Sequence, residues 1–385
     1  MKIGVPKEIQ ENETRVALVP QSLKKLTQKG LEILVEANAG SGALFSDKDY
    51  KEAGGIIAGS PEELYSSCDL IVKVRKPEFN PGLNKHEIDL MREESSLVSL
   101  LLPETNLDTV KKLTNKRVSA FSLDSVPRIT RAQSMDVLSS MSTIAGYKSV
   151  IIAAGFLPKF FPMLMTAAGT IAPAKVFVIG AGVAGLQAIA TAKRLGAVVE
   201  AFDTRAIVKE QVESLGARFV ALDLGNEETE GAGGYAKQVS KELHQRELEL
   251  IGRQIKKADV VITTAQVPGK RAPILITEQM VKEMQAGSVI VDLAADQGGN
   301  CEITELGKRV TVYEVTICGF LNLPASMPTH ASQMFSKNME SAIFHIVKNN
   351  QINFDLNDEI NKGALITHKG VILHENIKHL LAGVH

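Results

Sequence analysis

The sequence has no tryptophan and few aromatic residues of any kind. Phe, Tyr and Trp together make up 5% of its 385 residues, and the formal net charge is −1 at pH 7. Single-stranded nucleic acids are bound by aromatic side chains on which bases stack, and affinity for a phosphate backbone requires an excess of Lys and Arg. The composition therefore predicts no nucleic-acid partner.

Cysteine is also scarce. Cys68, Cys301 and Cys318 are the only three, they are widely separated, and no Cys-x-x-Cys pair occurs. An odd number of isolated thiols favours neither a disulfide framework nor a zinc site, and the eight histidines show no metal-ligand spacing. We expect no metal and a reducing compartment. Residues 1–6 also lack the apolar core of a signal peptide.

No uninterrupted apolar run is long enough to cross a membrane. Residues 160–174 and 176–192 contain no charged side chain, but each is shorter than the roughly 20 residues that a spanning helix needs. Prolines at 158, 162 and 173 interrupt the first stretch. We therefore expect no direct membrane insertion.

Short apolar runs alternate with helix-like patterns along most of the chain, which predicts parallel sheets covered by helices. Buried strands are first expected at 2–5, 32–36, 70–74, 96–102 and 117–121, with helices at 21–30 and 60–67. A second series of strands is expected at 176–179, 198–202, 218–221, 260–263 and 288–292. The predicted fold class is α/β, with two doubly wound Rossmann-like domains whose mostly parallel sheets are linked by long helices.

Two long helices mark the expected domain boundaries. The patterns at 135–155 and 326–349 predict helices that carry the chain out of the first domain and back into it. The first domain is expected to comprise residues 1–137 plus 330–385, and the second residues 138–329.

A glycine-rich turn opens the second series. The strand at 175–179 is followed by Gly180-Ala181-Gly182-Val183-Ala184-Gly185 and then by a helix. In a dinucleotide-binding turn the first glycine permits the tight bend, the second lets the backbone approach the pyrophosphate, and the third lets helix and strand pack closely. The start of the helix adds free N–H groups for phosphate. A doubly wound fold with an empty glycine turn is the alternative.

An acidic residue ends the next strand at the spacing that this motif requires. Asp203 follows Gly185 by 18 residues, close to the position of the acid that accepts hydrogen bonds from the adenine ribose. A carboxylate there repels a 2′-phosphate and so favours NAD over NADP. Arg205 is close enough to weaken that preference slightly. The nucleotide contacts expected around these motifs are Gly180, Gly182, Val183, Gly185, Asp203, Thr204 and Arg205.

Two stretches resemble known families. Residues 4–30, with Gly-Val-Pro-Lys-Glu at 4–8 and Arg-Val-Ala-Leu at 15–18, and residues 178–203 resemble the paired signatures shared by alanine dehydrogenases and proton-translocating nicotinamide nucleotide transhydrogenases. The resemblance covers essentially the whole chain. It implies an oxidoreductase that binds a nicotinamide dinucleotide.

The residues at two positions distinguish the two families. Alanine dehydrogenases carry a substrate-binding lysine and a catalytic histidine in the segments that correspond to 72–77 and 99–103. This chain has Arg75 and Leu101 at those positions. Because leucine cannot exchange a proton with an amino acid, the acid–base chemistry of oxidative deamination lacks its main group.

Residues 127–139 instead resemble the Arg-Ala-Gln-Ser-Met-Asp segment of the transhydrogenase component that binds NAD(H). The resemblance implies that Arg128, Asp136 and Ser139 hold the nicotinamide end and that Gln133 reaches toward the NADP(H) of a partner. Considered without the family, the segment is typical of an ordinary loop at the start of a helix. The residues of this segment expected to act in catalysis or contact the cofactor are Arg128, Ile129, Thr130, Arg131, Gln133, Asp136 and Ser139.

Two further loops carry expected nucleotide contacts. Residues 230–237 resemble the family's mobile loop, in which Gly234 and Tyr235 would close over the nucleotide; a surface loop with an incidental tyrosine is the alternative. Ala265 and Gln266 follow a buried strand and would line the nucleotide crevice. Asp296, in the Asp-Gln-Gly-Gly run at 296–299, resembles a segment of alanine dehydrogenases and keeps that alternative open.

The resemblance favours the NAD(H)-binding alpha component of a proton-translocating transhydrogenase. It implies that this chain binds NAD(H), that a partner subunit binds NADP(H), and that hydride passes directly between them. Membrane-spanning subunits would couple the transfer to proton translocation. A homodimer is implied, cytoplasmic and peripheral on the inner membrane through those partners. The alternatives are an NAD-dependent alanine or related amino-acid dehydrogenase and a non-catalytic NAD-binding module.

Overall fold

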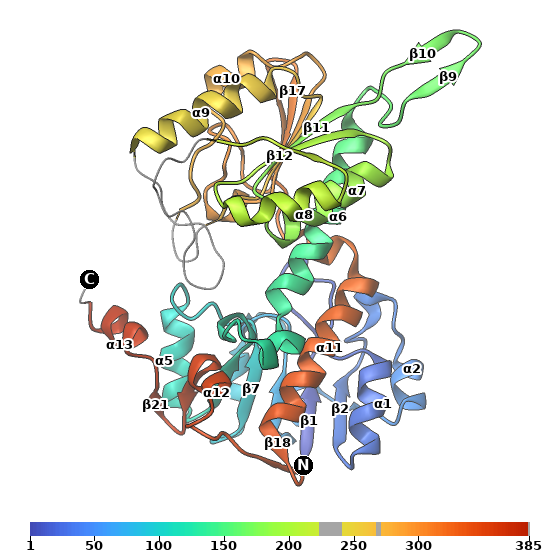
Figure 1. The fold of residues 1–385 in the computed structure, drawn as a ribbon. Coiled ribbons are helices and arrows are strands. Elements are labelled where there is room, and N and C mark those ends of the chain that lie inside the picture. The colour runs from blue at the N-terminus through green and yellow to red at the C-terminus, as the bar shows by residue number, and fades with distance from the viewer. Residues whose placement is uncertain (223–240, 267–270, 384–385) are drawn as a thin grey trace. The chain divides into compact units, whose positions relative to one another are not determined.

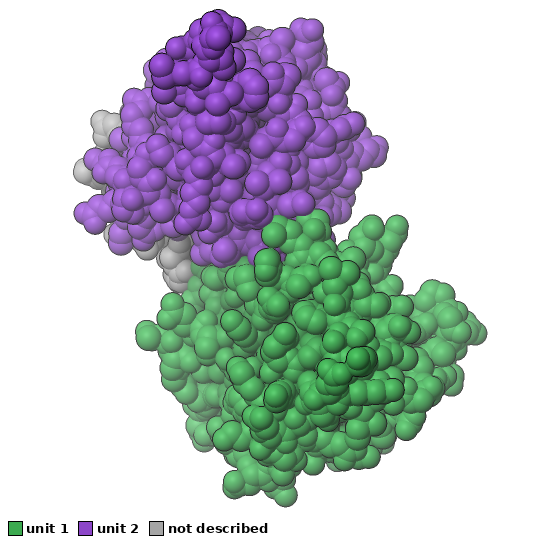
Figure 2. Space-filling view, turned by 90° about the vertical axis from the view of Figure 1, so that its right-hand side faces the viewer, with its two compact units in different colours: residues 1–141, 325–385 green, residues 142–324 purple. Residues whose placement is uncertain are grey.

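The computed structural model of the chain describes residues 1–222, 241–266 and 271–383. It divides into two compact units, Met1–Met141 with Ala325–His385 and Ser142–Pro324 (Figures 1 and 2). The chain leaves the first unit within helix α6, Val137–Phe156, and returns at residue 325, directly before helix α11, Pro328–Ile346. Helix α6 therefore spans the division, whereas α11 lies wholly in the first unit.

The first unit is built on an eight-stranded sheet. Its strand order is β21-β20-β8-β7-β4-β1-β2-β3, and the six strands from β8 to β3 are parallel. That order is the 3-2-1-4-5-6 arrangement of a doubly wound fold, extended by the antiparallel β20 and β21. The strands are β1 Lys2–Val5, β2 Glu32–Glu36, β3 Ile56–Ala58, β4 Leu70–Val72, β7 Ser96–Ser99, β8 Ser119–Ser122, β20 Leu365–His368 and β21 Val371–Ile372.

Helices cover this sheet between successive strands. Helix α3 packs against β1, β2 and β3, and α5 packs against β8, β20 and β21. Ser60 caps α3 by accepting a hydrogen bond from the N–H of Glu63, and Pro61 fills the first helical position, where a missing N–H has no cost. The helices are α1 Pro20–Gln28, α2 Asp47–Glu52, α3 Pro61–Ser67, α4 Glu87–Leu90, α5 Leu107–Asn115, α12 Glu359–Ala364 and α13 Glu375–Ala382.

The second unit repeats the same winding. Its seven strands follow the order β13-β12-β11-β14-β15-β17-β16, and all neighbours are parallel except β16 and β17. The strands are β11 Lys175–Ile179, β12 Val198–Phe202, β13 Arg218–Phe219, β14 Val260–Thr263, β15 Val289–Asp292, β16 Arg309–Val312 and β17 Val315–Cys318. The helices are α7 Val183–Arg194, α8 Lys209–Ser214, α9 Lys241–Ile255 and α10 Glu278–Lys282. The predicted fold class is confirmed in both units.

Central strands of the second unit are buried on both faces. In β11, Val176 and Val178 belong to one hydrophobic cluster, whereas Phe177 and Ile179 belong to the cluster on the opposite face. Alternation of side chains along a strand places neighbouring residues on opposite faces, so a continuous apolar run is what a doubly covered parallel strand requires. The same alternation occurs in β15, where Ile290 faces the second cluster.

An antiparallel hairpin was not expected from the sequence. Strands β9, Leu164–Thr166, and β10, Gly169–Ile171, pair with each other and project from the second unit (Figure 1). They occupy the uncharged stretch at 160–174. Several of its large apolar side chains are exposed, namely Phe160, Met163, Met165 and Ile171.

One helix among the described residues is long and apolar enough to cross a membrane by length and composition. It is α6, of which 39% is buried in its most apolar window. Core helices of globular proteins pass the same test, so this finding is weak evidence for a membrane span.

Candidate functional site

The glycine turn joins β11 to α7 and contains one backbone conformation that favours glycine. Gly180 has φ of +94°, and a Cβ built there would lie 2.6 Å from Oγ1 of Thr264. A Cβ on Gly185 would lie 1.9 Å from the carbonyl oxygen of Gly180. A side chain is disfavoured at position 180 by the positive φ and by Thr264, and is excluded at position 185 by direct backbone contact between the helix and the turn.

Gly182 differs from these two glycines. Its φ is −73°, which any residue adopts, and it is the N-cap residue of α7. Among the described residues other than its chain neighbours, the atom nearest to a Cβ there would be Nη2 of Arg205, at 4.0 Å. No contact among the described residues explains a glycine at this position. The space that a side chain would fill is open at the N-terminus of a 12-residue helix, where backbone N–H groups and the helix dipole favour phosphate.

Asp203 directly follows β12 and its side chain is almost completely buried. Oδ2 accepts hydrogen bonds from the N–H of Ala181 at 2.7 Å and from Nη2 of Arg205 at 2.7 Å. Oδ1 accepts from the N–H and the Nε of Arg205 at 2.8 and 2.9 Å. The carboxylate thus connects the end of β12 to the glycine turn and already holds four donors. Thr204 and Arg205 are half-buried beside it.

The described part of the loop after β14 also lies against the glycine turn. Thr264 donates its hydroxyl to the carbonyl oxygen of Gly180 at 3.0 Å. Ala265 and Gln266 are half-buried, and Nε2 of Gln266 donates to the carbonyl oxygen of Leu293 at 3.1 Å. We call residues 264–266 the 264–266 loop. Gly180, Gly182, Val183, Gly185, Asp203, Arg205, Ala265 and Gln266 are thus gathered around the carboxyl ends of β11, β12 and β14.

The 128–139 segment lies in the first unit, as a 3-10 helix over Thr130–Met135 that leads into α6. Arg128, Thr130, Arg131 and Gln133 are exposed, and Ile129 is half-buried. Arg131 pairs with Asp358, with 2.6 Å between Nη1 and Oδ2. The carboxylate of Asp136 accepts from the N–H of Ser139 at 2.9 Å and from its hydroxyl at 2.6 Å. Asp136 and Ser139 therefore satisfy each other at the start of α6, as a helix cap does.

Positions 75 and 101 contain no group that exchanges protons. Leu101 is 1% exposed and packs in a core cluster of the first unit. Arg75 donates from Nε to Oε2 of Glu13 at 2.9 Å, and Glu13 is also paired with Arg15 at 2.6 Å. Burial raises the pKa of Glu13, but its hydrogen bonds with Arg15 and the charges of Arg15 and Arg75 outweigh that effect and lower the pKa to about 2.

Glu8, Lys73, Glu87 and Tyr65 form a buried ionic cluster in the first unit. Nζ of Lys73 lies 2.8 Å from Glu87 and 3.6 Å from Glu8. The hydroxyl of Tyr65 donates to Glu87 at 2.6 Å. Burial raises the pKa of Glu8 to about 7, although the charge of Lys73 opposes the shift. Sequence reasoning missed this cluster, because its members are far apart in the chain.

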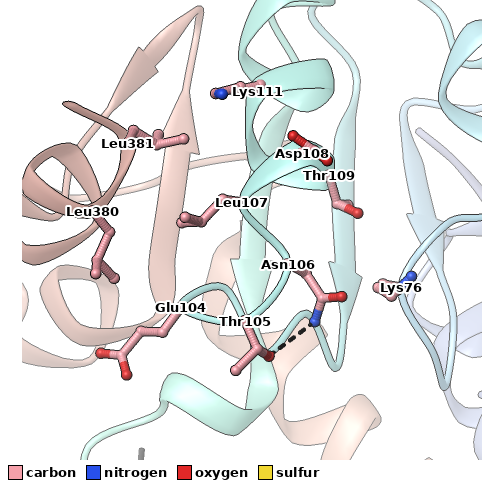
Figure 3. A pocket seen from close by; sticks show the side chains of 10 residues that line it. All are labelled: Lys76, Glu104, Thr105, Asn106, Leu107, Asp108, Thr109, Lys111, Leu380 and Leu381. Atoms are coloured by element: carbon pink, nitrogen blue, oxygen red, sulfur yellow. Dashed lines mark hydrogen bonds between the residues drawn. The ribbon is translucent and has the colours of Figure 1, made fainter. Parts of the chain in front are cut away.

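A pocket of about 480 Å³ opens beside the N-terminus of α5 (Figure 3). None of the residues predicted from the sequence to bind a nucleotide contributes to it. It is lined by Lys76, Glu104, Thr105, Asn106, Leu107, Asp108, Thr109, Lys111, Leu380 and Leu381.

Two predicted contacts cannot be placed, since Gly234 and Tyr235 lie outside the described residues. Among the residues that the structure describes, no three His, Cys, Asp or Glu side chains are arranged to hold a metal ion. The thiols of Cys68, Cys301 and Cys318 are buried, which raises the pKa of each to about 11. They are therefore poor nucleophiles.

Known proteins resemble this chain over nearly its whole length. The family models described as alanine dehydrogenase/PNT, N-terminal domain and C-terminal domain, match residues 4–145 and 149–375. An NAD(P) transhydrogenase subunit alpha polypeptide of Rhodospirillum rubrum is 45% identical over 377 residues, 97% of this chain and 98% of that protein. Alanine dehydrogenase 2 of Staphylococcus aureus is 30% identical over 389 residues, 98% and 95% of the two chains.

Among solved structures, a transhydrogenase and an alanine dehydrogenase resemble this chain. A transhydrogenase from Sinorhizobium meliloti superposes with a TM-score of 0.84 at 39% identity, covering 97% of this chain and 99% of that one. An L-alanine dehydrogenase superposes with a TM-score of 0.82 at 29% identity, covering 100% of both. The chain is thus an oxidoreductase of the Rossmann-like, NAD-binding class. The chain belongs to the alanine dehydrogenase/PNT family.

Proposed function

We propose that this chain is the NAD(H)-binding alpha component of a proton-translocating NAD(P) transhydrogenase. In this role it binds NAD(H) and holds it for hydride transfer with NADP(H) on a partner subunit. The observation that carries the proposal is the 45% identity to a transhydrogenase alpha subunit over nearly the full length of both chains. The likeness to alanine dehydrogenase 2 is weaker, at 30% identity.

The core environment of Leu101 favours transhydrogenase activity over amino-acid dehydrogenase activity. An amino-acid dehydrogenase needs a side chain that accepts and returns a proton at its substrate. Here the side chain at the corresponding position is apolar and packed into the core of the first unit. The guanidinium of Arg75, at the position of the substrate lysine, is paired with Glu13.

The proposed dinucleotide site lies in the second unit. In the proposed site, Gly182 leaves room for the pyrophosphate at the start of α7, where Val183 and its neighbours supply N–H groups. Asp203, flanked by Thr204 and Arg205, accepts the adenine ribose hydroxyls and disfavours a 2′-phosphate, so that NAD(H) is bound in preference to NADP(H). Ala265 and Gln266 line the same crevice, and Gly234 and Tyr235 close over the nucleotide.

For the 128–139 segment we propose the role that the family resemblance implies. Arg128, Asp136 and Ser139, with Ile129, Thr130 and Arg131, orient the nicotinamide end, and Gln133 faces the partner's nucleotide. When bound, the nicotinamide ring supplies hydride chemistry that requires positioning but no acid or base from the protein. The absence of a proton-exchanging group at position 101 is compatible with that chemistry.

Partners follow from the same proposal. Membrane-spanning and NADP(H)-binding subunits carry out proton translocation, and this chain is cytoplasmic and peripheral on the inner membrane through them. We also propose a homodimer. The exposed apolar side chains around the β9–β10 hairpin, including Met165 and Ile171, support self-association, because an isolated two-stranded hairpin is marginally stable in water.

Two assays on the purified chain test the function. Mixed with an NADP(H)-binding partner domain, the chain should catalyse the reduction of an NAD analogue by NADH or NADPH. Alone, it should show no NAD-dependent oxidation of alanine. Rapid alanine turnover by the chain alone would establish the amino-acid dehydrogenase instead. Nucleotide binding without either activity would leave only a binding module.

A further inference from the structure

Asp292, the last residue of β15, organises the loop that follows it. Its buried carboxylate accepts hydrogen bonds on Oδ1 from the hydroxyl of Thr263 at 2.9 Å and from the N–H of Ala294 at 3.0 Å. Oδ2 accepts from the N–H groups of Asn300 at 2.8 Å and Cys301 at 3.1 Å, and from the hydroxyl of Thr304 at 2.8 Å. Five donors on one carboxylate fix the path of the chain from residue 294 to 304.

The two glycines in this loop explain how the chain reaches Asp292. Gly298 and Gly299 have φ of +99° and +78°, a region that side chains rarely adopt. A Cβ on Gly299 would lie 2.9 Å from Oδ2 of Asp292. The Gly-Gly pair therefore turns the backbone tightly enough to bring the next residue, Asn300, under the carboxyl end of β14.

The side chain of Asn300 is completely buried and engages both its carbonyl oxygen and its amide nitrogen in hydrogen bonds. Oδ1 accepts from the N–H of Ala265 at 3.0 Å, and Nδ2 donates to the carbonyl oxygens of Ala265 at 2.9 Å and Pro273 at 2.8 Å. Both backbone polar groups of one residue, Ala265, are thus held by a single amide. The carbonyl oxygen of Asn300 itself accepts from the N–H groups of Leu275 and Ile276.

The residue before Ala265 carries this restraint to the glycine turn. The N–H of Thr264 donates to the carbonyl oxygen of Ile179 at 2.9 Å, and the Thr264 hydroxyl donates to the carbonyl oxygen of Gly180 at 3.0 Å. Contacts therefore run without a break from Asp292 through Asn300 to Ala265, and through Thr264 to the turn. Each of these residues belongs to the second unit.

We propose that Asn300 is a positioning residue for the nucleotide site, acting by fixing the 264–266 loop against the glycine turn. The inference rests on the proposed function, since it assigns that loop to the nucleotide. A buried amide that pairs with both the N–H and the C=O of one residue sets the position and orientation of that residue. Such a loop meets its ligand already ordered, so less conformational entropy is lost on binding. Asp292 acts one step further away, by holding Asn300.

The test compares Asn300→Leu with Thr304→Val in the full chain. Leucine branches at the same side-chain carbon as asparagine and has as many side-chain heavy atoms, but it makes none of the three hydrogen bonds to Ala265 and Pro273. Thr304→Val removes a hydrogen bond to the same Asp292 without touching the 264–266 loop, so it controls for general loss of stability. Asn300→Asp, which keeps the acceptor for the N–H of Ala265, serves as a second variant should the leucine variant not fold.

NADH titration and amide hydrogen exchange are measured for each folded variant. We expect the Kd for NADH to rise at least tenfold in the Asn300 variant and to change less than twofold in Thr304→Val. Exchange of the Ala265 amide should accelerate at least tenfold in Asn300→Leu only. Equal Kd values for the Asn300 and Thr304 variants, or unchanged exchange at Ala265 in a folded Asn300→Leu, would overturn the inference. Failure of the proposed function appears separately, as no NADH binding by the unmutated chain.

Discussion

The guanidinium of Arg205 and the carboxylate of Asp203 form a two-point ion pair, with Nε 2.9 Å from Oδ1 and Nη2 2.7 Å from Oδ2. A ribose diol also presents two donors to a carboxylate. Because the N–H groups of Ala181 and Arg205 hold the remaining acceptor positions, the ribose hydroxyls of the proposed site would reach Asp203 only if the Arg205 side chain moved aside. In the proposed site Arg205 is therefore the partner that moves, and its charge would stay close to the ribose.

The first prediction concerns the preference between NADH and NADPH. Asp203→Asn removes the charge that repels a 2′-phosphate and releases the guanidinium of Arg205 to pair with one. The ratio of the Kd for NADPH to that for NADH should fall at least tenfold, about 1.4 kcal/mol. Arg205→Met should raise the ratio, because it removes the positive charge that attracts a 2′-phosphate and leaves the negative charge of Asp203. Both ratios come from fluorescence titrations.

Stability has to be checked in the same variants. Asp203→Ala would leave the Arg205 charge and the N–H of Ala181 without their acceptor, and breaking one side of a buried pair costs about 3–5 kcal/mol. This truncation should therefore perturb folding as well as binding, whereas Asn keeps the size and an acceptor. If the ratio of the two Kd values does not change in Asp203→Asn, Asp203 does not bind the adenine ribose.

The second prediction separates two glycines of the same turn. Gly182→Ala places a methyl group in open space beside α7, so the unfolding free energy should fall by less than about 1 kcal/mol. The same methyl group occupies the space proposed for the pyrophosphate, and the Kd for NADH should rise at least tenfold. Gly185→Ala forces a Cβ to within 1.9 Å of a carbonyl oxygen, which should cost about 3 kcal/mol or more.

Thermal unfolding and NADH titration of the two variants decide the point. A Gly182→Ala protein that binds NADH as tightly as the unmutated chain would show that the open space is not part of the site. A Gly185→Ala protein of normal stability would contradict the close approach of Gly180 and Gly185.

Sequence periodicity predicts this fold well where strands are buried on both faces. The bounds of β1, β2, β12 and β14 agree with the expected ranges. Strands β4 and β7 end earlier than expected, at Val72 and Ser99. Beyond these strands, side-chain carboxylates accept hydrogen bonds from the backbone N–H groups. Glu8 accepts from Val74, and Asp124 accepts from Leu101. Apolar periodicity cannot reveal such replacements.

The site was less accessible to sequence reasoning than the fold. The glycine spacing and Asp203 are local signals, whereas Asn300 reaches Ala265 across 35 positions in sequence. The sequence points to Asn300 only indirectly. The Gly-Gly pair that precedes it indicates a tight turn, and a polar residue that such a turn buries needs hydrogen-bond partners nearby. The partner of Arg131, Asp358, is likewise 227 positions away.

The third prediction concerns acid stability and uses Glu13. Its pKa of about 2 in the folded chain lies below the ordinary value of 4.5, so the folded state binds this proton less readily than the unfolded state. Glu13 therefore stabilises the fold above pH 4.5 and loses that contribution as pH falls from 4.5 toward 2. The pKa difference corresponds to roughly 3 kcal/mol, which Glu13→Gln should remove at neutral pH.

Glu8 provides a control of opposite sign in the same unit. Because burial raises its pKa to about 7, ionising Glu8 opposes folding, and its effect on stability becomes less favourable as pH rises from 4.5 to 7. Relative to the unmutated chain, Glu8→Gln should gain stability as pH rises from 4.5 to 7. Glu13→Gln should be less stable by a constant amount above pH 4.5 and should approach the stability of the unmutated chain as pH falls toward 2. Thermal midpoints measured from pH 2 to 8 test both. Parallel pH profiles for all three proteins would contradict both assignments.

The fourth prediction addresses hydride transfer through Gln133. Its side chain is exposed in the 3-10 helix over Thr130–Met135, so Gln133→Ala should change stability by less than about 0.5 kcal/mol. If Gln133 faces the partner's nucleotide, its loss should leave the Kd for NADH within twofold and slow transfer at least tenfold in the mixed system, because misalignment of the reacting rings is costly. Ser134→Ala, at the adjacent exposed position, is the matched control and should transfer hydride normally. A Gln133→Ala protein that matches this control in rate would place Gln133 away from the contact between the two nucleotides.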